Sequence, residues 1–279
     1  MRILCLHGHG TSSDVLRYQM SGLIKGADPS WEFHYLSGEV NCPPAPGIGK
    51  LFPGPFFCYN RLFDPGSQLE SHALIEEEIH TYGPFDGAFG FSQGAAVIVS
   101  YLLERRAAYP DEAIPFRFLI LCSPVVPLAG NADYCHRILG CLNHDNESRI
   151  RSCQDKQISQ IPEPARIAMT MLTSVLDACA TITCEPRSFY LDRRLPDVPC
   201  ALHPDLCLTR LPVPTLHVRG NTDTQALWNC GLLIESFFDS PKQRVFEHKS
   251  GHDIPRSGPE VRQMLCAMEW VIAQSELPT

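Results

Sequence analysis

A serine between two glycines, Gly90-Phe91-Ser92-Gln93-Gly94, combines residue types that could do chemistry. A short apolar run precedes Ser92, and an apolar stretch at helical spacing follows it directly. A serine on a tight turn from strand to helix projects its hydroxyl above a sheet, and the small residues Gly90 and Gly94 leave room for that turn. The alternative is a serine that caps a helix, which is worth about 1 kcal/mol. The strand before it and the helix after it favour a nucleophile.

A serine nucleophile needs a base, and the base needs an acid that orients it. In the hydrolases that use this turn, both follow the serine in the order acid, then histidine. Asp223 follows the apolar run PTLHVRG, and His252 follows the run RVFEHKSG. Parallel strands meet ligands at their carboxyl ends, so we expect Ser92, Asp223 and His252 to converge at one edge of a sheet.

Three other residues could compete for these roles. Asp253 is a second candidate acid, but as the neighbour of His252 it is badly placed to contact that ring. Asp239 lies between a predicted helix and a predicted strand, where a solvated carboxylate is expected. His248 lies inside the last predicted strand, which favours a buried structural histidine over a base.

An oxyanion hole requires two main-chain N–H groups that point at the developing charge. Gln93 follows the serine at the positive end of its helix and is expected to supply one. His9, in the glycine-containing loop HGHGTSS after the first predicted strand, is expected to supply the other. A metal bound by His7 and His9 is the alternative. The sequence shows no third ligand clustered with them, so we expect no metal.

The elements that must position these residues alternate. Strands are predicted at 2–8, 31–36, 85–91 and 116–124, with helices at 12–26, 67–83 and 92–110 between them, and residues 41–58 form a loop rich in Pro and Gly. Such alternation favours an α/β fold with a mostly parallel central sheet and flanking helices. Residues 127–210 break the rhythm and are predicted to be an inserted lid with a few helical pieces, such as 163–180. Strands at 213–220 and 243–251 and helices at 224–238 and 259–275 then restore the alternation. Residues 1–279 are expected to form a single domain.

Composition narrows the classes of function. The formal net charge is −8 and no dense Lys/Arg run occurs, which argues against a nucleic-acid partner. The N-terminal apolar stretch is too short for a signal peptide, and no apolar run is long enough to predict a membrane span. An odd number of cysteines, 13, without a signal peptide favours free thiols, most of them buried, in a cytoplasmic protein. No Cys-x-x-Cys pair or other zinc-ligand spacing is present.

Several stretches together resemble one family: LCLHGHGTSSDVLRYQ, LFPGPFF, FDGAFGFSQGAA, LCSP, PTLHVRGNTD and SGHDIP. The chain is similar to the eukaryotic serine hydrolases of the ovarian-cancer-associated hydrolase type. The stretch EVNCPPAPGIGKLFPGPFF most resembles the fungal branch, the polyketide-pathway esterases and thioesterases of the lovastatin thioesterase type. Ser37 and Ser250 depart from the family pattern, and residues 127–210 do not match it.

The resemblance covers residues 1–125 and 211–275. It implies an α/β-hydrolase with Ser92, Asp223 and His252 as its triad, no cofactor, and an acyl thioester or ester substrate. It also implies that the acyl chain is held by the acyl carrier protein of a polyketide synthase.

Two further points stay open on the sequence alone. Four aromatic residues, Phe52, Phe56, Phe57 and Phe91, either line an acyl pocket or simply pack in the fold. The activity could instead be that of a general carboxylesterase on small esters. A hydrolase fold that binds ligands without catalysis is a third possibility, although such a protein has no need of an intact triad.

Overall fold

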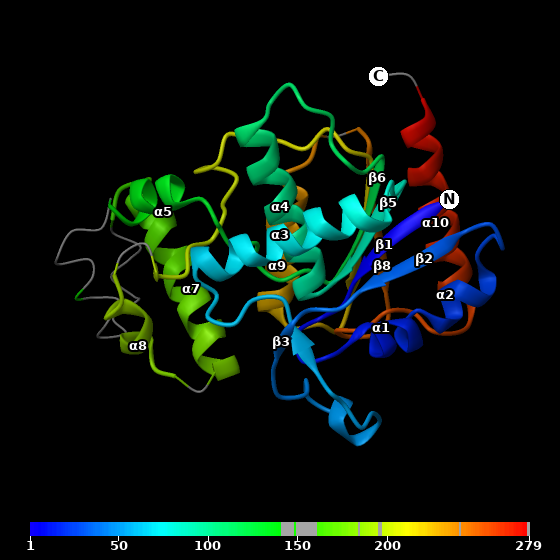
Figure 1. Ribbon diagram of the computed structural model, residues 1–279, viewed down its shortest axis with the longest axis horizontal. Helices are drawn as coiled ribbons and strands as arrows, with labels where there is room; N and C mark the ends of the chain where they lie inside the picture. The colour runs from blue at the N-terminus through cyan, green and yellow to red at the C-terminus, as the bar shows by residue number, and fades with distance from the viewer. Residues whose placement is uncertain (141–147, 149–160, 184, 195–196, 240, 278–279) are drawn as a thin grey trace.

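A single parallel sheet forms the centre of the computed structural model, which describes residues 1–140, 148, 161–183, 185–194, 197–239 and 241–277 (Figure 1). Its six strands lie in the order β2-β1-β5-β6-β7-β8, and every neighbouring pair is parallel. In chain order they are β1 (Arg2–Leu6), β2 (Glu32–Leu36), β5 (Gly87–Phe91), β6 (Phe118–Cys122), β7 (Thr215–Gly220) and β8 (Gln243–His248). The predicted α/β class and parallel sheet are therefore confirmed.

Alternate side chains of the inner strands β1, β5 and β6 fill two different cores. In β1, Ile3 and Cys5 pack with helices α1 (Ser13–Gln19), α2 (Ser21–Gly26) and α10 (Pro259–Glu276) on one face. Leu4 and Leu6 pack with α3 (Pro65–Tyr82), α4 (Gln93–Ala108) and α9 (Gln225–Glu235) on the other. A strand covered on both faces needs apolar residues at every position, which explains the continuous apolar runs of the sequence.

Two predicted elements differ in detail from the structure. The single helix expected over 12–26 is divided at Met20 into α1 and α2. Within α2, a Cβ atom at Gly22 would lie 2.2 Å from the main-chain oxygen of Arg256, so this helix packs directly on the backbone before α10. The loop expected over 41–58 contains a short antiparallel pair, β3 (Val40–Asn41) with β4 (Phe57–Cys58), and a 3-10 turn, η1 (Ile48–Lys50).

The described part of the predicted insertion contains three helices, α5 (Ala132–Leu139), α7 (Ala165–Thr183) and α8 (Arg187–Leu191), which gather at the left of Figure 1. Main-chain hydrogen bonds join its two ends: Ala129 N–H donates to Cys200 (2.7 Å) and Leu202 N–H donates to Pro127 (2.9 Å). The carboxylate of Glu104 on α4 accepts from two further main-chain N–H groups, at Gly130 and Asn131. The insertion therefore leaves and rejoins the rest of the fold at one place. Residues 127–131 and 200–202, which are hydrogen-bonded to each other and to α4, are called its neck.

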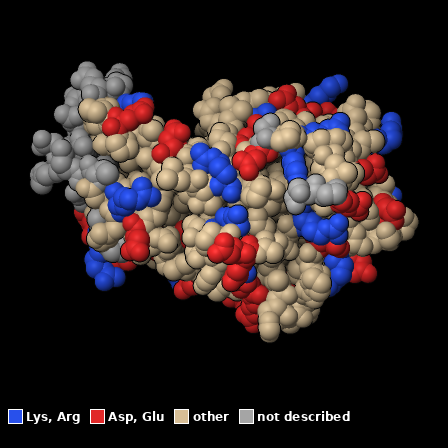
Figure 2. Space-filling view, turned by 90° about the horizontal axis from the view of Figure 1, so that it is seen from above, with Lys and Arg blue, Asp and Glu red and all other residues tan. Residues whose placement is uncertain are grey.

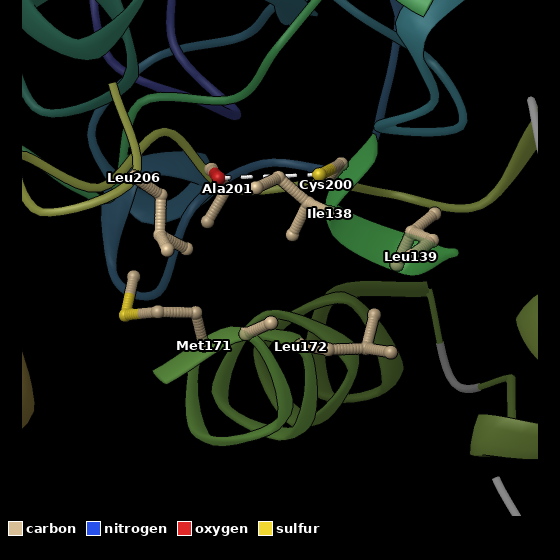
Figure 3. Close-up of a pocket in the computed structure, with 8 residues that line it drawn as sticks. Ile138, Leu139, Met171, Leu172, Cys200, Ala201 and Leu206 are labelled. Atoms are coloured by element: carbon tan, nitrogen blue, oxygen red, sulfur yellow. Dashed lines mark hydrogen bonds between the residues drawn. The ribbon is translucent and has the colours of Figure 1, made fainter. Parts of the chain in front are cut away.

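Helix α7, which corresponds to the predicted helical piece over 163–180, has the length and composition of a helix that could cross a membrane. Its buried side chains lie in the same core cluster as α3, α4 and α9: Ala168, Met169, Leu172, Val175, Leu176 and Cys179. Packing against α5 and the segment around Cys200 leaves a cavity of about 10 Å³, room for about one water (Figure 3). The apolar stripe of α7 thus contributes to the core that the insertion shares with the sheet.

Charged side chains are spread over the surface. Acidic and basic groups are interspersed on the face shown in Figure 2. Within the insertion, the Arg187 guanidinium binds Asp177 with two hydrogen bonds of 2.6 Å. Outside it, Arg105 pairs with Glu76 and Glu112.

Buried histidines make the stability of this fold depend on pH. Burial lowers the pKa of His7 from 6.5 to about 4 and that of His217 to about 3. Between pH 6.5 and 4 the unfolded chain therefore binds protons that the folded chain does not, so stability rises with pH. We expect the free energy of unfolding to fall by about 1.4 kcal/mol per pH unit for each such histidine as pH drops below 6.5. Urea unfolding at pH 7, 6 and 5 measures this slope.

A matched variant isolates one of the two contributions. In the His217→Leu variant, residue 217 of the unfolded chain can no longer bind a proton. The free energy of unfolding of this variant should therefore fall less steeply between pH 6 and 5 than that of the wild type. Equal slopes in the two proteins would contradict the assignment.

Candidate active site

Ser92 occupies a strained turn between β5 and α4. Its backbone has φ 54° and ψ −113°, in the left-handed region that residues with a Cβ rarely adopt. The Ser92 N–H donates to Cys122 of β6 at 2.9 Å, which holds the turn against the sheet. Its side chain makes no capping hydrogen bond to α4, so the structure does not support the helix-cap interpretation. The hydroxyl is free for another partner.

Two glycines allow this turn to form. A Cβ at Gly90 would lie 2.4 Å from the Cα of Ala95 in the first turn of α4. A Cβ at Gly94 would lie 2.4 Å from the main-chain oxygen of Leu6 at the end of β1. Both distances are far below a permitted contact, so either side chain would push α4 away from the sheet and move Ser92.

Ser92, His252 and Asp223 form a continuous hydrogen-bonded chain. His252 Nε2 lies 2.8 Å from Ser92 Oγ, and His252 Nδ1 lies 2.9 Å from Asp223 Oδ2. The Asp223 side chain is only 6% exposed, whereas that of His252 is 31% exposed. The other carboxylate oxygen of Asp223 accepts from the Thr224 N–H at 2.9 Å, which fixes the orientation of the acid. Three residues far apart in the sequence thus meet as serine, imidazole and carboxylate, in the order that the sequence predicts for a nucleophile, a base and an acid.

The residues that could compete with Asp223 and His252 have other environments. Asp253 binds Arg256 at 2.6 Å and accepts from the Ile254 N–H, so it helps to shape the loop that follows His252. Asp239 is exposed. His248 is fully buried at the end of β8, and burial lowers its pKa.

The two expected oxyanion donors follow neighbouring strands in register. Leu6 of β1 pairs with Gly90 of β5, so His9 and Gln93 lie equally far beyond the paired residues. Gln93 is the first residue of α4, where main-chain N–H groups have no partner within the helix. Among the hydrogen bonds of the described residues, none uses the main-chain N–H of His9 or Gln93 as donor. Both groups are therefore available at this edge of the sheet.

His7 shapes the loop that carries His9. Its Nε2 accepts from the Gly38 N–H at 3.0 Å, so its Nδ1 carries the proton and donates to the Gly8 oxygen at 2.7 Å. The His7 N–H donates to the Tyr59 hydroxyl at 2.9 Å. Burial lowers the pKa of His7 to about 4, so the ring is neutral near pH 7. This structural role of His7 and Tyr59 was not predicted from the sequence, because Gly38 and Tyr59 lie far from His7 along the chain.

The Gln93 side chain ties α4 to the segment after β4. Its Oε1 accepts from the Tyr59 N–H at 3.2 Å, and its Nε2 donates to Asn60 at 3.0 Å. Asn60 in turn donates to Gln68 of α3 at 2.8 Å. These buried amides fix the first turn of α4, and with it the direction of the Gln93 main-chain N–H.

The four phenylalanines suggested for a pocket occupy different environments. Phe91 is buried and its ring lies 5.1 Å from that of His252. Phe57 is half-buried and its main chain bonds to both Gly10 and Thr11 in the loop after β1. Phe52 is half-buried with its ring 5.4 Å from that of Tyr18. Phe56 is half-buried beside β4.

Two cavities in the described part of the chain lie away from Ser92. The cavity of Figure 3 is lined by apolar residues of α5, α7 and the segment around Cys200, and Met171 and Leu206 lie across it from one another. A larger hollow of about 450 Å³ lies between α4 and the neck of the insertion. Neither is lined by Ser92, Asp223 or His252.

Two cysteines lie beside His9, which corrects the expectation that no further ligand clusters there. His9, Cys42 and Cys58 offer ligand atoms that all lie within 4.8 Å of one another. A hydrogen bond between the two thiols lowers the pKa of Cys42 and raises that of Cys58. All ten cysteines in the described part of the chain are free thiols, and six are buried as expected.

The sheet, the strand-turn-helix at Ser92 and the hydrogen-bonded serine, histidine and aspartate define an α/β-hydrolase fold. A solved structure with the same fold is the monoacylglycerol lipase of Paleococcus ferrophilus, which is 13% identical with a TM-score of 0.50 and covers 98% of this chain and 94% of that one. The chain belongs to the serine hydrolase (FSH1) family, whose model matches residues 1–264.

Two fungal relatives match most of the chain. Serine hydrolase cnsH of Penicillium expansum is 84% identical over 239 residues, which cover 86% of this chain and 98% of the relative. Esterase alnB of Emericella nidulans is 36% identical over 281 aligned positions, which cover 99% of this chain and 98% of the relative. The chain is therefore a serine hydrolase that matches these fungal enzymes over nearly their whole length.

Proposed function

We propose that this hydrolase cleaves acyl thioesters or esters through a covalent acyl-enzyme, with Ser92 as nucleophile, His252 as base and Asp223 as orienting acid. The observation that carries the proposal is the hydrogen-bonded chain from Ser92 Oγ through the His252 ring to Asp223 Oδ2. A serine, a base within hydrogen-bond reach and a third group that orients the base make up the arrangement that activates a hydroxyl.

The first half of the reaction transfers the acyl group to the enzyme. Ser92 Oγ attacks the carbonyl carbon while His252 Nε2 takes the hydroxyl proton. Asp223 accepts from His252 Nδ1–H, which keeps the correct tautomer and stabilises the cationic ring. The tetrahedral intermediate then expels a thiol or alcohol, which leaves with the proton returned by His252.

The second half regenerates the enzyme. Water gives a proton to His252 and attacks the acyl-serine, and the products are a carboxylic acid and free Ser92. In both halves the negative oxygen is stabilised by the main-chain N–H groups of His9 and Gln93, which the His7 and Gln93 side-chain contacts hold in place. A fixed donor of this kind is worth about 3 kcal/mol of transition-state stabilisation.

The substrate is proposed to be an acyl chain on the pantetheine thiol of an acyl carrier protein in a fungal polyketide pathway. The resemblance of the stretch around residues 39–57 to polyketide-pathway thioesterases supports this. The relative alnB, which is named an esterase, supports hydrolysis of an acyl ester in general. Phe91 beside His252 and the half-buried phenylalanines of the 52–57 loop are suited to contact an apolar acyl chain. Residues 127–210 are proposed to act as the lid that shapes this pocket, and a cytoplasmic location fits a carrier-protein partner.

An activated Ser92 should react with a fluorophosphonate. Intact mass is expected to show a single adduct on the wild type and none on Ser92→Ala, because only the nucleophile is deprotonated by a neighbouring base. Ser123→Ala is the matched control: Ser123 also follows a buried strand with a positive φ, and its removal should leave the adduct intact. A folded wild type that takes no adduct would contradict an activated serine.

Asp223→Asn should lower kcat by roughly 10⁴-fold, because the amide NH2 can donate to His252 Nδ1, which favours the wrong tautomer, and a neutral amide does not stabilise the cationic ring. Asp253→Asn, at the other candidate acid, is the control. It loses only loop contacts and should change kcat by less than about tenfold. Steady-state hydrolysis of one activated ester measures both. Equal losses in the two variants would remove Asp223 from the proposed role.

Carrier recognition separates the proposed thioesterase from a general carboxylesterase. The same acyl group is presented on an acyl carrier protein, on free pantetheine and as a simple oxygen ester. A carrier contact worth about 1.4 kcal/mol would raise kcat/KM at least tenfold for the carrier-bound thioester over the pantetheine thioester. A higher kcat/KM for the oxygen ester, with no gain from the carrier, would favour the carboxylesterase. Binding without turnover of any of the three would favour a non-catalytic protein.

A further inference from the structure

Outside the hydrogen-bonded triad, one group of side chains has the composition of a metal site. Its ligand atoms come from three segments: the loop after β1 carries His9, the segment just after β3 carries Cys42, and β4 carries Cys58. Two thiols and an imidazole are the donor set that suits Zn²⁺, which takes Cys and His ligands in a tetrahedron. We propose that His9, Cys42 and Cys58 bind one Zn²⁺, with water in the fourth position.

The distances are close to those that zinc needs. Zn–S bonds of about 2.3 Å in a tetrahedron place two sulfurs roughly 3.8 Å apart. The three ligand atoms lie within 4.8 Å of one another. The two sulfurs must therefore close by about 1 Å at most, and each imidazole nitrogen–sulfur pair, ideally about 3.6 Å apart, by about 1.2 Å at most. Rotation of half-buried His9 and Cys42 side chains can supply that movement, while Cys58 is 2% exposed and fixed.

The backbone already holds the three segments together. Gly10 N–H donates to Phe57 at 3.0 Å and Phe57 N–H donates to Thr11 at 2.7 Å, which joins the loop after β1 to β4. Cys42 N–H donates to Phe56 at 3.0 Å, which joins the segment after β3 to the residue just before β4. Metal binding therefore orders no new loop, and the entropy that a mobile site must lose is small.

Bound zinc would fix the loop that carries His9 to the segments that carry Cys42 and Cys58. Zinc would bind the imidazole, and the main-chain N–H of the same residue stays available at the sheet edge. Zinc binding to these residues does not require the proposed hydrolysis, so retention of the metal can be measured whether or not the protein acts on thioesters.

Metal content of purified variants tests the site directly. The full-length protein is reduced, freed of reductant, incubated with Zn²⁺, desalted and analysed by atomic emission. The wild type and Cys266→Ser, which removes an exposed thiol elsewhere, should each retain one equivalent more zinc than Cys42→Ser or Cys58→Ser. His9→Asn should also lose that equivalent. Co²⁺ in place of Zn²⁺ should give thiolate-to-metal charge-transfer bands in the first two proteins only. Equal zinc in all of them would overturn the proposal.

A second measurement uses only the wild type, so it tests the site even if the substituted proteins fail to fold. Alkylation followed by peptide mass mapping should show Zn²⁺ slowing the modification of Cys42 at least tenfold while the rate at Cys266 stays unchanged. Equal slowing at both positions, or none, would count against the site. A Cys42–Cys58 disulfide that persists in the freshly reduced protein would also overturn it, because its sulfurs could not bind metal as thiolates.

Discussion

The left-handed backbone of Ser92 is the constraint on which the arrangement of the site depends. Such a conformation costs on the order of 1–3 kcal/mol and persists only where the surroundings enforce it. Here β6 binds the Ser92 N–H, and α4 begins at once against the end of β1 because Gly90 and Gly94 have no side chains. The turn prevents the hydroxyl from capping its own helix and aims it at His252 instead. Strain in one residue thus places both the Ser92 hydroxyl and the first N–H of α4.

The loop after β1 depends on a different kind of constraint, a buried histidine that stays neutral. His7 uses both ring nitrogens and its main-chain N–H on three separate partners, Gly8, Gly38 and Tyr59. Because the ring carries no charge, it can be fully buried without an ion-pair partner. The loop is therefore fixed before a substrate arrives, and donors that need no reorganisation stabilise developing charge best.

The sequence predicted the central features because their signals are local. Ser92, Asp223 and His252 each follow a recognisable apolar strand, and the geometry of parallel sheets brings such ends together. The contacts that it could not predict join distant segments through single side chains. His7 with Tyr59, and His9 with Cys42 and Cys58, are pairs of this kind, and no spacing rule connects them. Helix α7 also has a local signal, because the helical piece predicted over 163–180 corresponds to the helix observed at Ala165–Thr183.

The insertion is tied to the site more closely than its place in the sequence suggests. Arg193, just after α8, lies 3.6 Å from the carboxylate of Asp64, which caps the first turn of α3. The preceding residue, Phe63, is buried with a positive φ, and its ring lies 6.2 Å from that of His9. One ion pair and one fixed backbone turn therefore connect the insertion to the loop after β1. The described residues of 127–210 share a core with the sheet, and Arg193 contacts the segment next to the proposed oxyanion site. Substrate preference therefore has to be measured on the full chain, with this insertion in place.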